Sequence, residues 1–214
     1  MDMMFFVRQQ SNQCGLHAIQ NLFKSALITA EDLHTSCEDI NKETGDAITN
    51  HESFGGDWSV SAVIKAITVQ GYSVTRSVNT KRQRDWCVDS IDTLMKRDDF
   101  RGFIIHQPQS RHFTCLRPEE VGGERHLYYV DSQARGPIRI SPKLAVRRCL
   151  EPAYAWEPFL ISGPEMNYVG PQNSPEPVSI YEGAVSEEQE KFQPSAGFLR
   201  DWEELSKTMS SKTI

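Results

Sequence analysis

Apolar residues in the first third of the chain recur at the spacing of an α-helix, three or four positions apart. Three such stripes occur, and they comprise Leu16, Ile19, Leu22, Phe23 and Ala26; then Leu33, Cys37 and Ile40; then Val60, Val63, Ile64 and Ile67. Residues at this spacing lie on one face of a helix. Thr29 and Ser59 precede the second and third stripes, and such residues cap helix N-termini. The pattern therefore predicts three amphipathic helices.

The remainder of the chain, to about residue 162, favours strands with two shorter helices among them. Residues 72–78 alternate between apolar and polar types, as half-buried strands do. Further strand candidates are residues 103–106, 113–117, 127–131 and 159–161. Residues 91–95 carry a short apolar helical stripe, and Ser141-Pro142 is a typical helix start. With helices first, strands later and no internal repeat, we expect an α+β fold.

The composition changes near residue 163. Residues 164–214 contain nine acidic and four basic residues, five of the eleven prolines and no cysteine. Such a segment buries too little apolar surface to offset its ordering entropy. We therefore expect a folded domain over residues 1–163 and a mostly disordered acidic tail over 164–214. Phe198, Trp202 and Leu205 have helical spacing, so a short helix near 197–207 either docks on the domain, stays unordered or binds a partner.

The overall composition narrows the class of protein. The 214 residues are 38% hydrophobic and 24% charged, which is typical of a globular chain. No apolar stretch approaches the ~20 residues that span a bilayer, and the first residues lack the pattern of a signal peptide. The net charge of −6 disfavours nucleic acid as the main partner.

The cysteines indicate a reducing environment. They lie at positions 14, 37, 87, 115 and 149, an odd number that is widely spread and contains no C-x-x-C pair. This is not the pattern of a disulfide framework. We therefore expect a cytoplasmic or nuclear setting, where thiols stay reduced.

Cys14 is a candidate nucleophile because it stands where the first predicted helix begins. Backbone N–H groups at a helix N-terminus carry partial positive charge, which stabilises a thiolate. The thiolate is the attacking species in acyl transfer. The alternative is an ordinary half-buried cysteine, and position alone does not decide between the two.

Residues 111–117 and 125–131 flank a turn-like segment, 118–124, and predict a β-hairpin. If the strands pair symmetrically about Val121-Gly122, His112 lies opposite Asp131. The other pairs on that face are then Thr114 with Tyr129 and Leu116 with Leu127. Opposed residues have Cβ atoms ~5 Å apart, so the carboxylate could orient the imidazole and leave its other nitrogen to accept the thiol proton. A slip of one residue would separate the two side chains, and the sequence leaves that alternative open.

Other residues compete for these roles. His106 and His126 flank the hairpin, but His112 starts a strand near the proposed carboxylate and is preferred. Gln9, five residues before Cys14, could donate to an oxyanion. Gln10 and Gln13 are rivals for this role, and all three could equally be surface residues.

His17 completes a C-x-x-H pattern with Cys14, which would be half of a zinc site. No second half with suitable spacing follows, so we expect no metal. We interpret His17 as a helix residue that makes structural hydrogen bonds.

Four segments of the chain resemble motifs of the Josephin family. The nucleophile motif is matched by Arg8-Gln9 and Gln13-Cys14-Gly-Leu-His17-Ala-Ile-Gln-Asn21-Leu22. In the family, a Gln lies five residues before the Cys, a His follows at plus three and Asn-Leu at plus seven. The second motif resembles residues 56–64, the catalytic-histidine strand 111–117, and the strand of the third triad member 129–132 with 135–137. Order and spacing agree over about residues 5–162, and the similarity is greatest to the short Josephin-only proteins.

This resemblance implies a papain-like cysteine protease fold, with N-terminal helices packed on a C-terminal antiparallel sheet. It implies a cysteine-type deubiquitinase that cleaves isopeptide or peptide bonds after the C-terminus of ubiquitin, through a thioester. The implied roles are Cys14 as nucleophile, His112 as base and then acid, Asp131 as orienting group and Gln9 in the oxyanion hole. Ubiquitin and ubiquitinated proteins are the implied partners, and residues 27 to about 53 match a helical arm that contacts ubiquitin. No metal or organic cofactor is implied.

The chain departs from the family pattern in a few places. Phe5-Phe6-Val7 stands where the family often has Tyr-His-Glu, and Asp131 stands where some members have Asn. Neither change removes a catalytic group, but the hairpin loop and the arm differ in length and sequence, which leaves substrate preference open. Two other functions remain: a papain-like peptidase not specific for ubiquitin, and an inactive ubiquitin-binding module.

Overall fold

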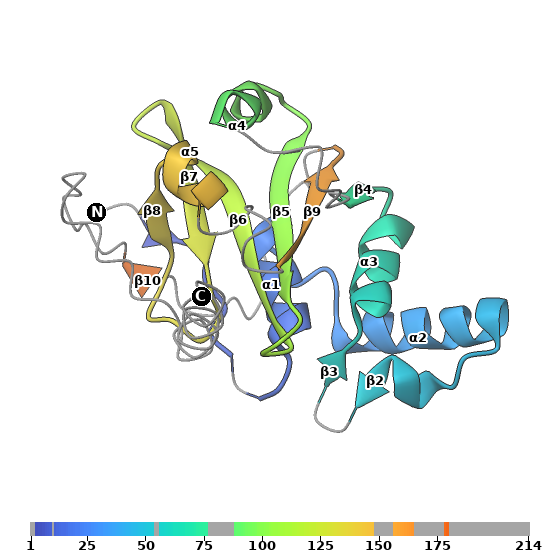
Figure 1. Ribbon diagram of the computed structural model, residues 1–214. Helices are drawn as coiled ribbons and strands as arrows, with labels where there is room; N and C mark the ends of the chain where they lie inside the picture. The colour runs from blue at the N-terminus through green and yellow to red at the C-terminus, as the bar shows by residue number, and fades with distance from the viewer. Residues whose placement is uncertain are drawn as a thin grey trace, which may run out of the picture.

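The computed structural model describes residues 3–9, 11–53, 56–76, 88–147, 156–164 and 178–179. One large antiparallel sheet has helices on both faces, and α2, α3 and a small sheet lie together at one side of it (Figure 1). The expected α+β class is therefore confirmed. No helix within the described ranges is both long and apolar enough to cross a bilayer.

The large sheet has six strands in the order β4-β9-β5-β6-β7-β8, and every neighbouring pair is antiparallel. Their bounds are Ser73–Arg76 for β4, Phe100–Gln107 for β5, His112–Val121 for β6, Glu124–Val130 for β7, Ile138–Ile140 for β8 and Glu157–Ser162 for β9. All five strand predictions are confirmed. The edge strand β8 was not predicted, because it is only three residues long.

The β6–β7 hairpin is tighter than the sequence suggested. The predicted turn over residues 118–124 is mostly strand, and the ladder closes at the pair Val121–Glu124. Only Gly122 and Gly123 form the turn, with φ of 62° and 82°. A two-residue turn of this kind needs positive φ at both positions, which glycine adopts at little cost.

The tighter turn changes the strand register. Direct pairing of His112 with Asp131 is wrong by two residues, since Leu116 lies opposite Tyr129. Side chains alternate with a period of two, so a shift of two keeps each side chain on its predicted face. Accordingly Leu116 and Tyr129 are buried in the same cluster.

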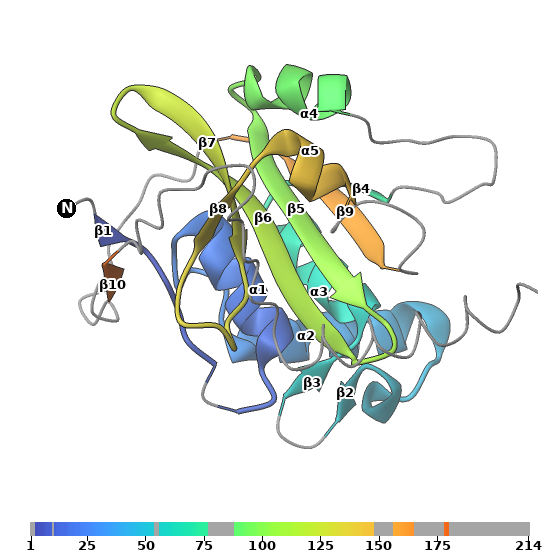
Figure 2. The same cartoon turned by 60° about the vertical axis from the view of Figure 1, so that its left-hand side comes forward.

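Helices cover both faces of the sheet, as Figure 2 shows. Their bounds are Cys14–Phe23 for α1, Ala30–Thr44 for α2, Val60–Val69 for α3, Val88–Met95 for α4 and Pro142–Ala145 for α5. Side chains that alternate along β5 serve two cores: Ile104 packs with α1 to α3, whereas Phe103 and Ile105 pack with α4 and α5. All five predicted helices are confirmed, although the first ends before Ala26.

The predicted N-caps form where expected. Thr29 and Asp32 make a reciprocal capping box at the start of α2, with the Thr29 N–H donating to the Asp32 carboxylate at 2.7 Å. The Ser59 and Ser141 hydroxyls accept from the backbone three residues later, at 3.1 and 3.2 Å. Each cap satisfies a backbone donor that the helix itself leaves unpaired.

The segment from α2 to α3, residues 30–69, is called here the helical arm. Between its helices lie the 3₁₀ turn η1 (Ile48–Asn50) and the paired strands β2 (Glu52–Ser53) and β3 (Asp57–Trp58). Buried residues of α2 join the same hydrophobic core as α1. The arm is therefore anchored beside the helix that carries Cys14.

The two ends of the described chain meet in a second small sheet. Strand β1 (Met3–Met4) pairs antiparallel with β10 (Val178–Ser179). Of these two strands, β10 lies within the segment 164–214 that was expected to be mostly disordered. The short helix expected near 197–207 lies outside the described residues.

Candidate active site

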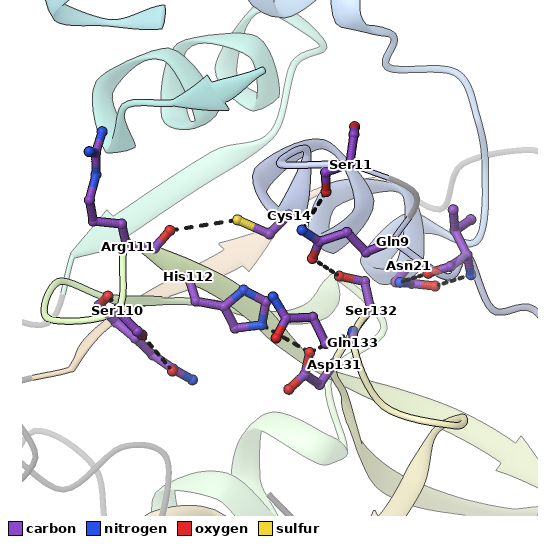
Figure 3. A network of polar contacts seen from close by, with 12 residues as sticks. Gln9, Ser11, Cys14, Asn21, Ser110, Arg111, His112, Asp131, Ser132 and Gln133 are labelled. Atoms are coloured by element: carbon purple, nitrogen blue, oxygen red, sulfur yellow. Dashed lines mark hydrogen bonds and ion pairs between the residues drawn. The ribbon is translucent and has the colours of Figure 1, made fainter. Parts of the chain in front are cut away.

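Cys14 is the first residue of α1, and its side chain is buried. The N-cap residue Gln13 makes no side-chain capping hydrogen bond, so the partial positive charge of the helix start acts next to the sulfur. The thiol donates to the carbonyl oxygen of Arg111, with Sγ and O 3.7 Å apart. This contact joins the start of α1 to the residue before β6 (Figure 3).

His112 is the first residue of β6, and Asp131 directly follows β7. The Nε2–H of His112 donates to Oδ1 of Asp131 at 2.9 Å, and both residues are at least nine-tenths buried. The same carboxylate oxygen accepts the Gln133 N–H at 2.9 Å, which fixes its direction. Because the ring also hydrogen-bonds with Cys14, its two nitrogens serve two different partners. The structure thus brings together the three residues that the sequence singled out.

The charge state of His112 follows from these neighbours. Burial disfavours the imidazolium and by itself lowers the pKa, but the hydrogen bonds and negative charges of Asp131 and Cys14 outweigh it. The net result is a pKa raised from 6.5 to about 9. A ring with this pKa is protonated at neutral pH, so the sulfur of Cys14 has a cationic neighbour.

Arg111 holds an uncommon position beside the pair. Its φ of 52° is in the left-handed region, which costs a non-glycine residue roughly 1–2 kcal/mol. Its guanidinium pairs with Asp57 of the helical arm at 2.6 Å. A pocket of about 260 Å³ opens here, lined from the arm by residues including Trp58 and from the sheet by Arg111 and Phe113. The arm and the start of β6 therefore form the two walls of one cleft.

Gln9 lies between the residue after Asp131 and the start of α1 (Figure 3). Its backbone N–H donates to the Ser132 carbonyl at 2.8 Å. Its side-chain Oε1 accepts from the Ser132 hydroxyl at 3.2 Å, and its Nε2 donates to the Ser11 carbonyl at 2.5 Å. The carboxamide is thus held at both ends close to the helix start that carries Cys14.

Two buried polar residues hold the extended segment that leads to Gln9. The Asn21 carboxamide makes a two-point contact with Val7, accepting its N–H at 2.7 Å and donating to its carbonyl at 3.0 Å. Arg117, fully buried in β6, donates to the carbonyls of Phe5 and Asn21 and pairs with Glu119 at 2.8 Å. These contacts fix the approach of the segment to α1.

The rival residues lie in other environments. His106 hydrogen-bonds Glu157 at 2.9 Å, and His126 accepts from Arg139 at 2.9 Å. The side chain of Gln13 packs against Gly56 of the arm. Gln10 lies outside the described residues.

His17 is buried in α1, and neither ring nitrogen has a hydrogen-bond partner among the described residues. The prediction of structural hydrogen bonds is therefore wrong. Burial lowers the pKa of His17 to about 4, so the ring is neutral at physiological pH. Within the described ranges, no three His, Cys, Asp or Glu side chains are grouped as a metal site requires.

The other two cysteines that the structure describes contrast with Cys14. Cys37 in α2 and Cys115 in β6 are completely buried. Burial, followed by the charge of Glu52, raises the pKa of Cys37 to about 11, and burial raises that of Cys115 to about 12. Both stay protonated at neutral pH and are poor nucleophiles.

Sequence reasoning from chemistry missed the supporting residues. Ser132 and Asn21 stand inside the family motifs but carried no assigned role. Arg117 ends the motif over residues 111–117, but it was assigned no role because an arginine in a strand is expected to face solvent.

Comparison with known proteins agrees with this geometry. The model of the Josephin family matches residues 9–157, more than two thirds of the chain. A comparison with curated proteins gives no match. The matched range contains Gln9, Cys14, His112 and Asp131 together with the six-stranded sheet up to the start of β9. The chain therefore belongs to the Josephin family, a deubiquitinase-type cysteine protease family with a papain-like fold.

Proposed function

We propose that this protein is a deubiquitinase that hydrolyses isopeptide or peptide bonds after the C-terminus of ubiquitin. The observation that carries the proposal is the position of His112 between a helix-start cysteine and a buried carboxylate, with Nε2 2.9 Å from Asp131 Oδ1. In a chain of the Josephin family, this arrangement has the parts that acyl transfer through a cysteine requires.

Acylation begins with the thiolate of Cys14. It attacks the carbonyl carbon of the terminal glycine of ubiquitin, and the carbonyl oxygen becomes an oxyanion. The backbone N–H of Cys14 and the side-chain amide of Gln9 are the proposed donors to this oxyanion. Such donors act most strongly in a site from which water is partly excluded, and Cys14 is buried.

Collapse of the tetrahedral intermediate needs a proton on the leaving amine. The His112 imidazolium donates it, and the C–N bond breaks to leave ubiquitin as a thioester on Cys14. His112 then accepts a proton from water as that water attacks the thioester, and the C–S bond breaks in the second collapse, which releases the C-terminal carboxyl group of ubiquitin and restores the Cys14 thiolate beside the imidazolium. Asp131 keeps the ring oriented and stabilises its charge in both halves.

The cleft between the helical arm and the start of β6 is the proposed path of the substrate. One of its lining residues, Arg111, reaches the active site, because its carbonyl oxygen is 3.7 Å from the sulfur of Cys14. The resemblance to the Josephin family implies a ubiquitin contact over residues 27 to about 53, most of which belong to the arm. Ubiquitin bound there would direct its C-terminal residues into the cleft.

Hydrolysis of ubiquitin–aminomethylcoumarin tests this function. Wild-type protein should release the fluorophore, and Cys14→Ala and His112→Ala should lose turnover. Cys37→Ala and His126→Ala are matched controls, because one thiol has a pKa of about 11 and the other ring pairs with Arg139. Full activity of either active-site variant would reject the assignment. Turnover of a Gly-Gly peptide amide without turnover of the ubiquitin substrate would indicate a peptidase of another specificity.

A further inference from the structure

We infer that Ser132 is a positioning residue, whose hydroxyl restrains the Gln9 carboxamide and so completes the oxyanion hole. This inference rests on the proposed function and deepens it. Ser132 is 2% exposed, and its hydroxyl donates to Gln9 Oε1 at 3.2 Å. A buried hydroxyl directed at a functional amide restricts the rotation of that amide.

The contacts define which end of the carboxamide faces which neighbour. The carbonyl oxygen of Ser11 can only accept a hydrogen bond, so Gln9 must turn its nitrogen towards it. Oε1 then faces Ser132, whose hydroxyl donates to it. The Ser11 carbonyl therefore selects the orientation, and the Ser132 hydroxyl, which can donate or accept, restrains the oxygen end by donating to it.

This orientation matters for catalysis. A carboxamide nitrogen has two hydrogens, and Ser11 takes one of them, which leaves the second for an oxyanion. The opposite orientation would present the lone pairs of Oε1 to a developing negative charge. Preorganised donors supply much of the stabilisation of such a transition state, so loss of orientation should lower the rate without weakening substrate binding.

The position of Ser132 in the chain links the two halves of the site. Asp131 orients the His112 ring, and the next residue orients Gln9. The Ser132 carbonyl also accepts the Gln9 backbone N–H at 2.8 Å. A Ser132→Ala variant keeps this backbone contact and removes only the hydroxyl, so the segment stays in place while the carboxamide is held by Ser11 alone and becomes more mobile.

A double-mutant cycle tests the inference, with the fluorogenic ubiquitin substrate and a short Gly-Gly peptide amide. We expect Ser132→Ala to lower kcat about tenfold with KM unchanged. This loss is smaller than the loss caused by deleting an oxyanion donor, because Gln9 itself remains. In a Gln9→Ala background the same substitution should have no further effect. Ser132→Thr retains the hydroxyl and should keep kcat within about threefold. Ser110→Ala is the matched control, because that hydroxyl bonds Gln107 instead.

Alkylation of Cys14 by iodoacetamide separates this role from a general structural one. The reaction forms no oxyanion, so its rate and pH profile should be the same in Ser132→Ala as in wild type. An altered profile would show that Ser132 acts through Asp131 and would overturn the inference. Unchanged kcat, equal losses with and without Gln9, or a Ser132→Thr variant as slow as the alanine variant would also overturn it.

The two substrates keep this inference distinct from the proposed function. Wild-type turnover of the peptide alone would reject the ubiquitin specificity, and the cycle would then be measured on the peptide. Absence of turnover with both substrates would reject the enzymatic function and the role of Ser132 together.

Discussion

Replacing Asp131 by asparagine should move the alkaline limit of activity to lower pH. Each tenfold change in a protonation equilibrium is worth about 1.4 kcal/mol, so raising the pKa of His112 from 6.5 to about 9 corresponds to roughly 3 kcal/mol in favour of the imidazolium. Asp131 and Cys14 share this effect. Asparagine retains an acceptor for Nε2–H but loses the charge. The Gln133 N–H, which can only donate, would keep the amide oxygen turned towards the ring.

The direction of the expected change in pH dependence follows from the raised pKa of His112. The imidazolium form of His112 exists below the pKa of the ring and is lost as the pH rises through about 9. In Asp131→Asn we expect this limb of kcat/KM, and of the Cys14 alkylation rate, to lie about one to two pH units lower, with partial activity at neutral pH. The assays are a pH series with fluorogenic substrate and with iodoacetamide. Identical alkaline limbs in the two proteins, or a limb moved upward, would refute the role given to the Asp131 charge.

Four further outcomes are expected. Gln9→Ala should lose about 2–4 kcal/mol of transition-state stabilisation, measured as kcat/KM, and an unchanged rate would exclude its oxyanion role. Asn21→Ala leaves the Val7 N–H and carbonyl unpaired and should lower the free energy of unfolding by about 1–3 kcal/mol in urea; no loss would contradict the clamp. Arg117→Ala should cost about 3–5 kcal/mol, against less than 1 for the exposed Arg139→Ala. Burial keeps His17 neutral, with a pKa of about 4. The free energy of unfolding should therefore include a contribution of up to roughly 3 kcal/mol that is present above pH 6.5 and lost as the pH falls towards 4. In His17→Leu, the free energy of unfolding should depend less on pH in this range.

Local patterns were sufficient to predict the five helices and five of the six strands of the large sheet. Caps such as Thr29 and Ser59, and apolar stripes with helical period, depend on contacts within a few residues, so they are visible without a fold. The hairpin register could not be predicted in this way, because Pro118, Glu119 and Glu120 suggested a turn, whereas all three are paired within β6. Gly122-Gly123 was the signal that could have placed the turn, since two adjacent glycines suit a two-residue turn.

Two residues of the candidate site, Cys14 and His112, could be proposed from the sequence alone. A cysteine at a helix start and a histidine at a strand start suggest a role by type and position. Arg117 and Ser132 serve the site through contacts between segments about 100 residues apart in the chain, with Phe5 and Gln9 respectively. Such contacts depend on the folded arrangement, and neither residue type indicates them. His17 likewise looked like a hydrogen-bonding residue, but the fold buries it without a partner in the described residues.

The central claim is that Cys14 attacks the C-terminus of ubiquitin. The most direct test is reaction with a ubiquitin probe bearing a cysteine-reactive group at its C-terminus, followed by peptide mapping of the adduct. We expect one adduct on Cys14 of the wild-type protein, none on Cys14→Ala and an undiminished yield on Cys37→Ala. Labelling of another cysteine, or no adduct while Cys14 still reacts quickly with iodoacetamide, would contradict the claim.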